Sequence, residues 1–442
     1  MKKILTTFIA IIIVISNILP VYAEEISQTS YPLYPIIESE AAVLMDARTG
    51  QVLFAKNMDE QLYPASITKI MTVLLGIENG NLNDIITMSR EAVFSIERGS
   101  SHIALDVGEQ ITLEQALMAA ILPSANEACN GIAEHVSGSI PEFIKLMNER
   151  ANEAGALHTN FTNANGLYKD DHVTTAYDMA MITQTALKND QFCRIFGTSK
   201  YEIPPTNMQS KPRYLWAQHK MFPCGRYEYE GVIGGKTGYT QESQRTLVTA
   251  AQRGDRELIA VVLKSQNIAV YTDTKALLDY GFNEFTQAQI MLPAVTRDNL
   301  ANPPDNLQKL QKIINQIKAE NYTRLLHKNI DVNDIVIDYV AVNNPDDENV
   351  QLNINMRLKD NSDLMYGNLG TISVDCPQNN ENTILGKILN IVLIIMKIIA
   401  AAVIFLFALR WFIKIKRKMS RGRFSCHQII SNIFRRISQM IK

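Results

Sequence analysis

The chain has 442 residues, of which 46% are hydrophobic and 20% are charged, and its formal net charge is −2. This composition provides enough apolar side chains for a packed core and excludes a disordered or low-complexity protein. The length suits two domains and an anchor better than a single domain. Basic residues are concentrated near the C-terminus, which leaves the rest of the chain acidic and predicts no nucleic-acid partner.

The N-terminus has the pattern of a secretory signal peptide. Lys2 and Lys3 precede an apolar run that ends at Leu19, and a small-x-small cleavage sequence follows at residues 21–23. We therefore expect residues 1–23 to be removed and the body of the protein to lie outside the cytoplasm. An uncleaved N-terminal anchor is the alternative.

Between the two ends, the hydrophobic pattern predicts one long α/β (α+β) domain over residues 35–284. Two strands open it, a helical middle follows, and three strands and a helix close it, which indicates one sheet flanked by helices. The expected strands are 41–46, 51–55, 231–239, 246–251 and 258–263; the expected helices are about 70–80, 112–122, from 126 onward, 139–155, 175–187 and 273–280, the last ended by Gly281.

The pattern changes after residue 284. Residues 299–306 are rich in Pro, Asn and Asp and are predicted to be a linker. Alternating segments at 330–342 and 349–358 predict strands, so residues 285–375 are expected to form a small, mostly β second domain. The five cysteines follow no metal-ligand spacing, and no metal site is predicted.

A second apolar run, residues 388–413, predicts a transmembrane helix. Lys397 and Arg410 lie near the ends of its core, where their side chains reach the headgroups. Residues 414–442 contain Lys and Arg but no Asp or Glu, so they are predicted to form a basic cytoplasmic tail of a single-pass cell-membrane protein. A helix lying along the membrane surface is the alternative.

Ser66 and Lys69 form a Ser-x-x-Lys sequence at the expected start of the first helix. Residues three apart on a helix share a face, and the dipole favours an anion at the helix N-terminus. A lysine can take the proton from such a serine if burial keeps its amine neutral. A capped helix with a surface lysine has the same pattern.

Two further motifs follow in order. Ser124 and Asn126 stand between two helices, where they would serve as a proton relay and an orienting amide, or simply as a helix cap. Lys236, Thr237 and Gly238 lie in an expected strand that would present them to a substrate carboxylate; a surface strand with a turn is the plainer interpretation. All three motifs together, each in a fitting context, indicate a serine nucleophile with a lysine base.

The residues around these motifs resemble the D-alanyl-D-alanine carboxypeptidases of the S11 serine peptidase family, the low-molecular-weight penicillin-binding proteins. The resemblance covers about residues 38–283. It implies a β-lactamase/transpeptidase-like catalytic domain with a central antiparallel sheet flanked by helices. It is carried by the stretches Ala42–Gly50, Pro64–Thr72, Leu122–Ala128, Asn165–Leu167, His172–Ala180 and Gly234–Thr240.

The resemblance also implies a reaction that needs no cofactor. Ser66 attacks the carbonyl between the two D-alanines of a peptidoglycan stem peptide, Lys69 takes its proton, and β-lactam antibiotics acylate the same serine. Backbone N–H groups of Ser66 and Tyr239 form the oxyanion hole. The catalytic residues are thus expected to be Ser66, Lys69 and Ser124, and the substrate-binding residues Asn126, Lys236, Thr237, Gly238 and Tyr239.

Two segments depart from the family's pattern. Residues 243–245, Ser-Gln-Arg, stand where an Ala-Gly pair is usual, and residues 264–267 lack the glycine and arginine expected beside the last core strand. These departures leave substrate detail and turnover rate open, but not the nucleophile. His172 is expected to be a packing or loop residue.

Three other functions match parts of the sequence. A class A β-lactamase needs a glutamate between the second and third motifs, and residues 160–200 contain none. An endopeptidase or transpeptidase acting on cross-links would differ in the shape of its cleft. A non-catalytic penicillin- or wall-binding protein has no use for a lysine base beside a nucleophile.

Overall fold

A computed structural model of the protein describes residues 34–303, 313, 320–343, 350–359, 368–374 and 410. The expected signal peptide and basic tail lie outside these residues, and so does the expected membrane span apart from Arg410. Within the described ranges, no helix has both the length and the apolar character needed to cross a membrane. Nearly all described residues belong to one compact unit, Met1–Asn343 with Val350–Val374.

The centre of this unit is a five-stranded antiparallel sheet with the strand order β2-β1-β9-β8-β7. The N-terminal β1 pairs with the late strand β9, with Ala41 opposite Leu263, so the sheet is assembled from both ends of the domain as predicted. The strands are β1 (Ala41–Asp46), β2 (Val52–Lys56), β7 (Val232–Thr240), β8 (Gln244–Arg253) and β9 (Arg256–Ser265).

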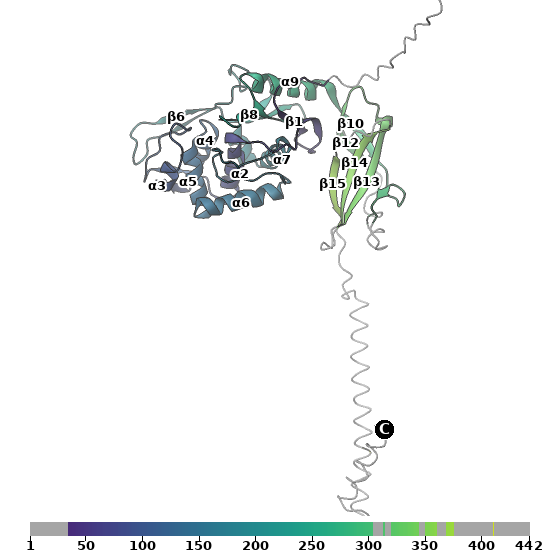
Figure 1. Ribbon diagram of the computed structural model, residues 1–442, viewed down its shortest axis with the longest axis horizontal. Coiled ribbons are helices and arrows are strands. Elements are labelled where there is room, and N and C mark those ends of the chain that lie inside the picture. Colours follow the sequence, from purple (N-terminus) through teal and green to yellow (C-terminus); the bar gives the residue numbers. More distant parts are fainter. Residues whose placement is uncertain are drawn as a thin grey trace, which may run out of the picture. The chain divides into compact units, whose positions relative to one another are not determined.

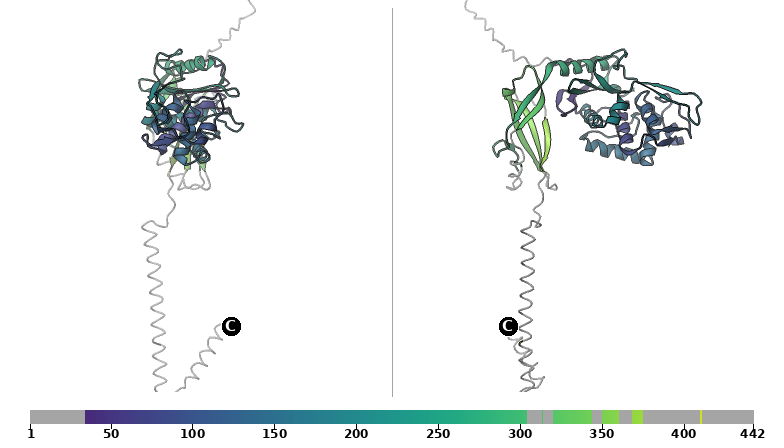
Figure 2. Two further views of the ribbon diagram at one scale, coloured as in Figure 1. Left: turned by 90° about the vertical axis from the view of Figure 1, so that its left-hand side faces the viewer. Right: turned by 180° about the vertical axis from the view of Figure 1, so that it is seen from behind.

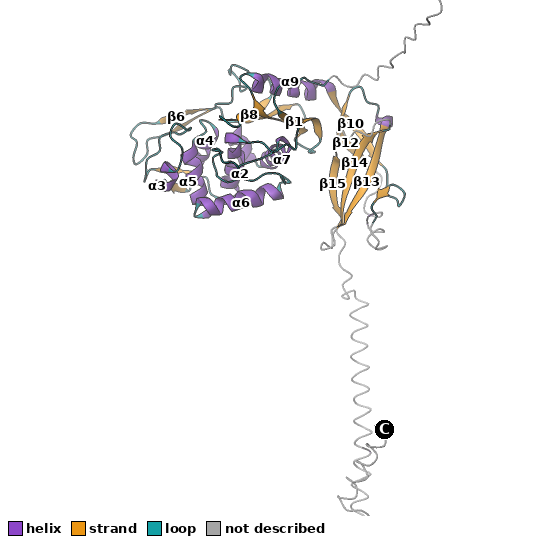
Figure 3. Cartoon of the chain, viewed as in Figure 1, coloured by secondary structure: helices purple, strands orange, loops and turns teal. Residues whose placement is uncertain are grey.

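Helices cover both faces of this sheet (Figures 1 and 3). Val43 and Met45 of β1 belong to the core shared with the helical middle, whereas Leu44 faces Gly281 of α9 on the opposite side. Because both faces are covered, every residue of β1 is buried. The helices are α2 (Lys69–Asn79), α3 (Arg90–Phe94), α4 (Leu113–Ile121), α5 (Asn126–Ser137), α6 (Ile140–Glu153), α7 (Ala176–Leu187), α8 (Asp190–Phe196) and α9 (Ala269–Glu284).

Several helix starts follow their sequence signals. At α4, Thr112 and Gln115 form a full capping box, in which each side chain bonds the backbone N–H of the other. At α6 and α7, the hydroxyls of Ser139 and Thr175 accept hydrogen bonds from backbone N–H groups in the first turn. These boundaries could therefore be predicted from local chemistry.

The predicted end of the last helix at Gly281 is wrong, because α9 continues to Glu284. A Cβ at position 281 would lie 2.5 Å from Leu258 Cδ1 and 2.8 Å from Leu44 Cδ2. The glycine therefore allows α9 to pack closely on the sheet and does not act as a helix terminator. The first helix also differs, since a 3-10 turn, η1 (Ala65–Thr68), precedes α2.

Two small two-stranded sheets were not predicted. Their strands come from the chain between α2 and β7, in the part of the protein that Figure 2 shows from two further sides. Each consists of strands of three or four residues, too short for a clear alternating pattern. They are β3 (Ile85–Thr87) with β4 (Gln110–Thr112), and β5 (Lys200–Ile203) with β6 (Arg213–Trp216).

The described part of residues 285–374 is also rich in strands. Two antiparallel strands form one sheet, and four strands form another in the order β11-β13-β14-β15. The predicted linker contains the short strand β11, and a 3-10 turn, η2 (Val332–Asp334), lies inside the segment expected to be a strand from residue 330. A separate second domain stays a prediction. The strands are β10 (Phe285–Leu292), β11 (Leu300–Ala301), β12 (Glu320–His327), β13 (Ile335–Asn343), β14 (Val350–Leu358) and β15 (Asn368–Val374).

Candidate active site

Ser66 lies in η1, the tight turn that leads into α2. Side chains three residues apart eclipse in a 3-10 turn, and Lys69 Nζ donates a hydrogen bond to Ser66 Oγ over 3.0 Å. The preceding Ala65 has a φ of 51°, which is unusual for a residue with a side chain. Gly166 lies against it, since a Cβ there would be 2.0 Å from Ala65 O. The backbone around the serine is therefore strained and supported by a close neighbour.

Lys69 is fully buried and has three hydrogen-bond partners. Besides Ser66, its Nζ contacts Asn126 Oδ1 at 2.7 Å and the backbone oxygen of Asn165. Burial disfavours the ammonium form and lowers the pKa of Lys69 to about 8. About a tenth of the amine is thus neutral at pH 7, and only the neutral amine can accept the proton of Ser66.

Ser124 and Lys236 form a second serine–lysine pair. Lys236 Nζ donates to Ser124 Oγ over 3.0 Å and to Thr237 O over 2.9 Å. Burial lowers the pKa of Lys236 well below its usual range, and the charge of Lys69 lowers it further. Ser124 joins α4 to α5 with a φ of 67°, so its backbone, like that of Ala65, has the left-handed conformation.

Strand β7 passes directly beside the serine turn. A Cβ at Gly238 would lie 2.9 Å from the backbone N of Ser66 and 2.3 Å from Thr246 Oγ1, so only glycine fits there. Because β7 is at the edge of the sheet, alternate backbone N–H groups of this strand are not used by β8. The free edge of β7 therefore lies next to Ser66.

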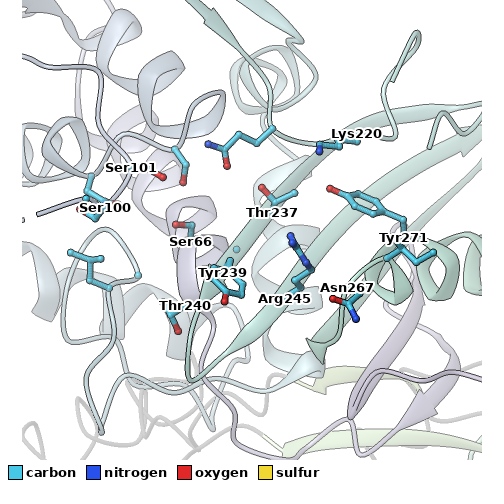
Figure 4. Close-up of a pocket in the computed structure, with 18 of the residues that line it drawn as sticks. Ser66, Ser100, Ser101, Lys220, Thr237, Tyr239, Thr240, Arg245, Asn267 and Tyr271 are labelled. Carbon is cyan, nitrogen blue, oxygen red and sulfur yellow. The ribbon is translucent and has the colours of Figure 1, made fainter. Parts of the chain in front are cut away.

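These residues enclose a pocket of about 700 Å³ (Figure 4). None of the described residues that line it is Asp or Glu, whereas Lys220, Arg226 and Arg245 contribute positive charge. Lys69 and Lys236 do not line the pocket themselves. Each donates a hydrogen bond to a serine that does, Lys69 to Ser66 and Lys236 to Ser124. Of the eight residues selected from the sequence, six line the pocket: Ser66, Ser124, Asn126, Thr237, Gly238 and Tyr239.

Several neighbours of the site are not evident from the sequence. Asn165 contributes a backbone oxygen, which leaves no signature in a sequence. His219 is buried against Gly235, where a Cβ would lie 2.2 Å from its ring, and its Nε2 is 2.8 Å from Thr249 Oγ1. Arg245 lies in a segment that departs from the family pattern. Its positive charge and its place near the third motif are the signals in the sequence that it belongs to the site.

His172 supports the serine turn from outside the pocket. Its Nδ1 accepts a hydrogen bond from Thr162 N over 2.9 Å, and its Nε2 lies 2.9 Å from Thr68 Oγ1. Burial lowers the pKa of His172 to about 3, so the ring is neutral at physiological pH. A buried, neutral histidine that bonds η1 is a structural residue.

A serine hydroxyl hydrogen-bonded to a buried lysine, beside the edge strand of an antiparallel sheet flanked by helices, is the arrangement of a serine hydrolase. Residues 27–267 match the peptidase S11 family, described as D-alanyl-D-alanine carboxypeptidase. The D-alanyl-D-alanine carboxypeptidase DacF of Bacillus subtilis is 32% identical over 345 residues, which are 76% of this chain and 84% of that protein. The chain therefore belongs to the S11 family of D-alanyl-D-alanine carboxypeptidases.

Solved structures show the same fold. The Streptomyces K15 DD-transpeptidase matches with a TM-score of 0.53 and 29% sequence identity, over 56% of this chain and 98% of that one. Penicillin-binding protein 6B from Escherichia coli matches with a TM-score of 0.56 and 24% identity, over 78% of this chain and 96% of that one. The central antiparallel sheet flanked by helices is thus the expected fold.

Proposed function

We propose that the protein is a serine D-Ala-D-Ala carboxypeptidase that removes the terminal D-alanine from peptidoglycan stem pentapeptides. The contact between Ser66 Oγ and the buried Nζ of Lys69, at the wall of the pocket, carries this proposal. The family and the named relatives supply the substrate class.

In the proposed acylation, Ser66 Oγ attacks the carbonyl carbon between the two D-alanines while the neutral Lys69 amine takes its proton. Asn126 Oδ1, 2.7 Å from Lys69 Nζ, holds the amine in this direction. The backbone N–H groups of Ser66 and Tyr239 stabilise the oxyanion. The peptide C–N bond then breaks and leaves an ester on Ser66.

The leaving nitrogen needs a proton to depart as free D-alanine. Ser124 Oγ supplies it and is reprotonated through the lysines, since Lys236 Nζ is already hydrogen-bonded to this oxygen. Water then attacks the ester with Lys69 again as base, which releases the tetrapeptide and restores Ser66. Thr237 and Gly238, which line the pocket, contact the substrate during both steps.

The same serine is expected to react with penicillins, whose strained amide takes the place of the D-Ala-D-Ala bond. No described residue of the pocket wall is an Asp or Glu that could activate a hydrolytic water, as a class A β-lactamase requires. The described wall of the pocket therefore favours a peptidase over a class A β-lactamase.

We also propose that the catalytic domain is held outside the cytoplasm by one C-terminal membrane span. The signal-peptide pattern of residues 1–23, the apolar run 388–413 and the basic tail 414–442 support this arrangement. Protease added to intact spheroplasts should then remove the catalytic domain and leave a small tail fragment. Full protection of the chain would contradict the arrangement.

The function is tested by measuring D-alanine release from a soluble pentapeptide ending in D-Ala-D-Ala, with purified full-length protein beside its Ser66→Ala variant. Release by the wild type alone would establish the carboxypeptidase and its nucleophile together. A cross-linked peptide dimer belongs in the same assay. Cleavage of the dimer without D-alanine release would indicate an endopeptidase, and penicillin binding without any cleavage would indicate a binding protein.

A further inference from the structure

The small sheet of β5 and β6 is packed on one side only. Ile203 of β5 and Leu215 of β6 are buried in the hydrophobic core. On the outer face of the sheet, the side chains of Tyr214 and Trp216 are 56% and 63% exposed, and their ring centroids are 6.2 Å apart. Single exposed apolar residues are normal on a protein surface, but two adjacent rings on an anchored sheet indicate a contact surface.

Two charged side chains flank these rings. Lys200 lies opposite Trp216 in the β5–β6 ladder, Glu202 lies opposite Tyr214, and both charged residues are exposed. Residues directly opposite each other in a ladder point to the same face of the sheet. We call these four residues the aromatic face. It presents two rings, a hydrogen-bond donor and a hydrogen-bond acceptor side by side.

This combination is suited to a sugar. A sugar ring presents C–H groups on one side and hydroxyl or amide groups around its edge. The electron-rich face of an aromatic ring attracts the C–H groups, while charged side chains bond the polar groups. A contact with another protein would instead favour an apolar centre that is depleted of Lys and Glu.

The aromatic face continues into the wall of the pocket. Residues 213–220 alternate between exposed and more buried side chains, and the exposed ones after Trp216 are Gln218 and Lys220. Both of these residues line the pocket. Two residues of chain span at most about 7 Å, so Trp216 lies close to the pocket wall.

Arg213 fixes β6 beside one end of this wall. Its Nε donates a hydrogen bond to Ile103 O over 3.0 Å, and its Nη2 donates to Ala104 O over 2.8 Å. These two residues closely follow Ser100 and Ser101, which line the pocket. The aromatic face therefore belongs to the end of the pocket that contains these serines.

The stem peptide is expected to leave the pocket at this end. Figure 4 shows Ser100 and Ser101 on one side of Ser66 and Thr237 on the other. Because the terminal carboxylate of the substrate is expected at Thr237, the rest of the peptide passes the two serines. Four residues of a pentapeptide precede the scissile bond, and they span at most about 14 Å when extended. The sugar to which the peptide is attached then comes within reach of β6.

We propose that the aromatic face binds the glycan strand of peptidoglycan, the polymer of N-acetylated amino sugars that carries the stem peptides. Trp216 and Tyr214 stack on sugar rings, and Lys200 and Glu202 bond the hydroxyl and amide groups of these sugars. This inference rests on the proposed function, because the stem peptide is what brings the glycan to this face. The face holds the polymer while the pocket acts on an attached peptide.

The kinetic test compares two substrates that carry the same pentapeptide, one free and one attached to glycan chains. For Trp216→Ala and for Tyr214→Ala, kcat/KM on the attached pentapeptide should fall about 3-fold to 10-fold, chiefly through KM. On the free pentapeptide, both variants should change kcat/KM by less than about twofold, because the sugar is absent. Equal losses on both substrates, or no loss on either, would overturn the proposal.

Leu157→Ala is the matched control for the loss of an exposed apolar side chain. Leu157 is 69% exposed and lies between α6 and α7, outside the pocket wall. This variant should match the wild type on both substrates. Equal melting temperatures of all variants would confirm that the losses do not come from unfolding.

Glycan binding by full-length Ser66→Ala protein separates this proposal from the proposed function. The chain has two tryptophans, so in a Trp411→Phe background the indole fluorescence reports on Trp216 alone. Glycan strands freed of peptide by an amidase should shift this fluorescence to shorter wavelength, and Tyr214→Ala should weaken their binding about 3-fold to 10-fold. This result would support the glycan site even if the wild type released no D-alanine.

Two results of the binding experiment would overturn the glycan site even in an active carboxypeptidase. One is the absence of any fluorescence shift with peptide-free glycan. The other is a loss of binding to phospholipid vesicles in Trp216→Ala while glycan binding stays intact, since this would assign the aromatic face to a membrane contact.

Discussion

Lys236 Nζ donates a hydrogen bond to Ser124 Oγ over 3.0 Å, although 112 positions separate the two residues in the chain. Lys69 makes the equivalent contact with Ser66 only three positions away. The site therefore contains two serine–lysine pairs, one local and one that exists only in the folded protein. Because the charge of Lys69 lowers the pKa of Lys236, the protonation states of the two lysines are also coupled electrostatically.

The first prediction concerns pH. The pKa of Lys69 is lowered to about 8, so its neutral, proton-accepting form increases as the pH rises through this value. Acylation of Ser66 should accelerate from about pH 6 and level off above about pH 9. The rate of penicillin acylation, followed by stopped-flow fluorescence, checks this. A rate independent of pH would exclude Lys69 as the base.

Replacement of Asn126 by Asp should change the same profile. The new carboxylate would lie where Oδ1 now contacts Lys69 Nζ at 2.7 Å, and a negative charge at this distance stabilises the ammonium form. The acylation profile should therefore move to higher pH by about one unit or more, with a lower rate at neutral pH. Asn126→Ser removes the amide without adding charge, so its acylation rate should fall while the pH profile stays in place. If the profile of Asn126→Ser moved to higher pH as well, the electrostatic explanation would be wrong.

Replacing Ser124 by Gly or Ala separates chemistry from stability. Both variants lose the hydroxyl that Lys236 contacts, so both should release D-alanine more slowly by a similar factor of at least about 100. Only glycine adopts the φ of 67° without strain, so Ser124→Gly should be about 1 kcal/mol more stable than Ser124→Ala. Urea unfolding measures this difference. Equal stability, or retained activity in either variant, would count against the role of this residue.

Alanine at Gly166 should displace the serine turn. Its Cβ would lie 2.0 Å from Ala65 O, and the φ of 85° adds strain, so activity should fall at least about 100-fold. Gly138→Ala is the matched control, because Gly138 also has a positive φ, 75°, but nothing lies within 4 Å of its Cβ position. That variant should lose about 1 kcal/mol of stability and keep full activity. Comparable activity losses in both variants would show that strain alone is responsible.

The central sheet could be predicted because its inner strands β1 and β9 contain nearly continuous apolar runs, which a sheet covered on both faces requires. The three motifs also indicated which side chains would meet around Ser66, since each occupies a distinct local context. The two small two-stranded sheets could not be predicted because strands of three or four residues carry too little pattern.

Other features depend on contacts that no local pattern encodes. The partner of Lys69 at Asn165 is a backbone oxygen, and Gly281 is explained only by Leu44 and Leu258, which come from distant strands. Arg245 is visible in the sequence, but only the pairing of β8 with β7, where Arg245 lies opposite Tyr239, brings it to the pocket. The roles of these residues therefore depend on tertiary contacts between segments that are distant in the sequence.

The pairing of β1 with β9 also determines when activity can first arise during synthesis. Until β9 leaves the ribosome, the apolar β1 has no partner on that side and is an exposed edge prone to aggregation. The serine turn is incomplete as well, because Thr246 of β8 bonds the oxygen of Pro64 just before it. A nascent chain interrupted before Arg256 is therefore a target for chaperones and proteases, and the nucleophile becomes competent only after nearly the whole catalytic domain has been synthesised.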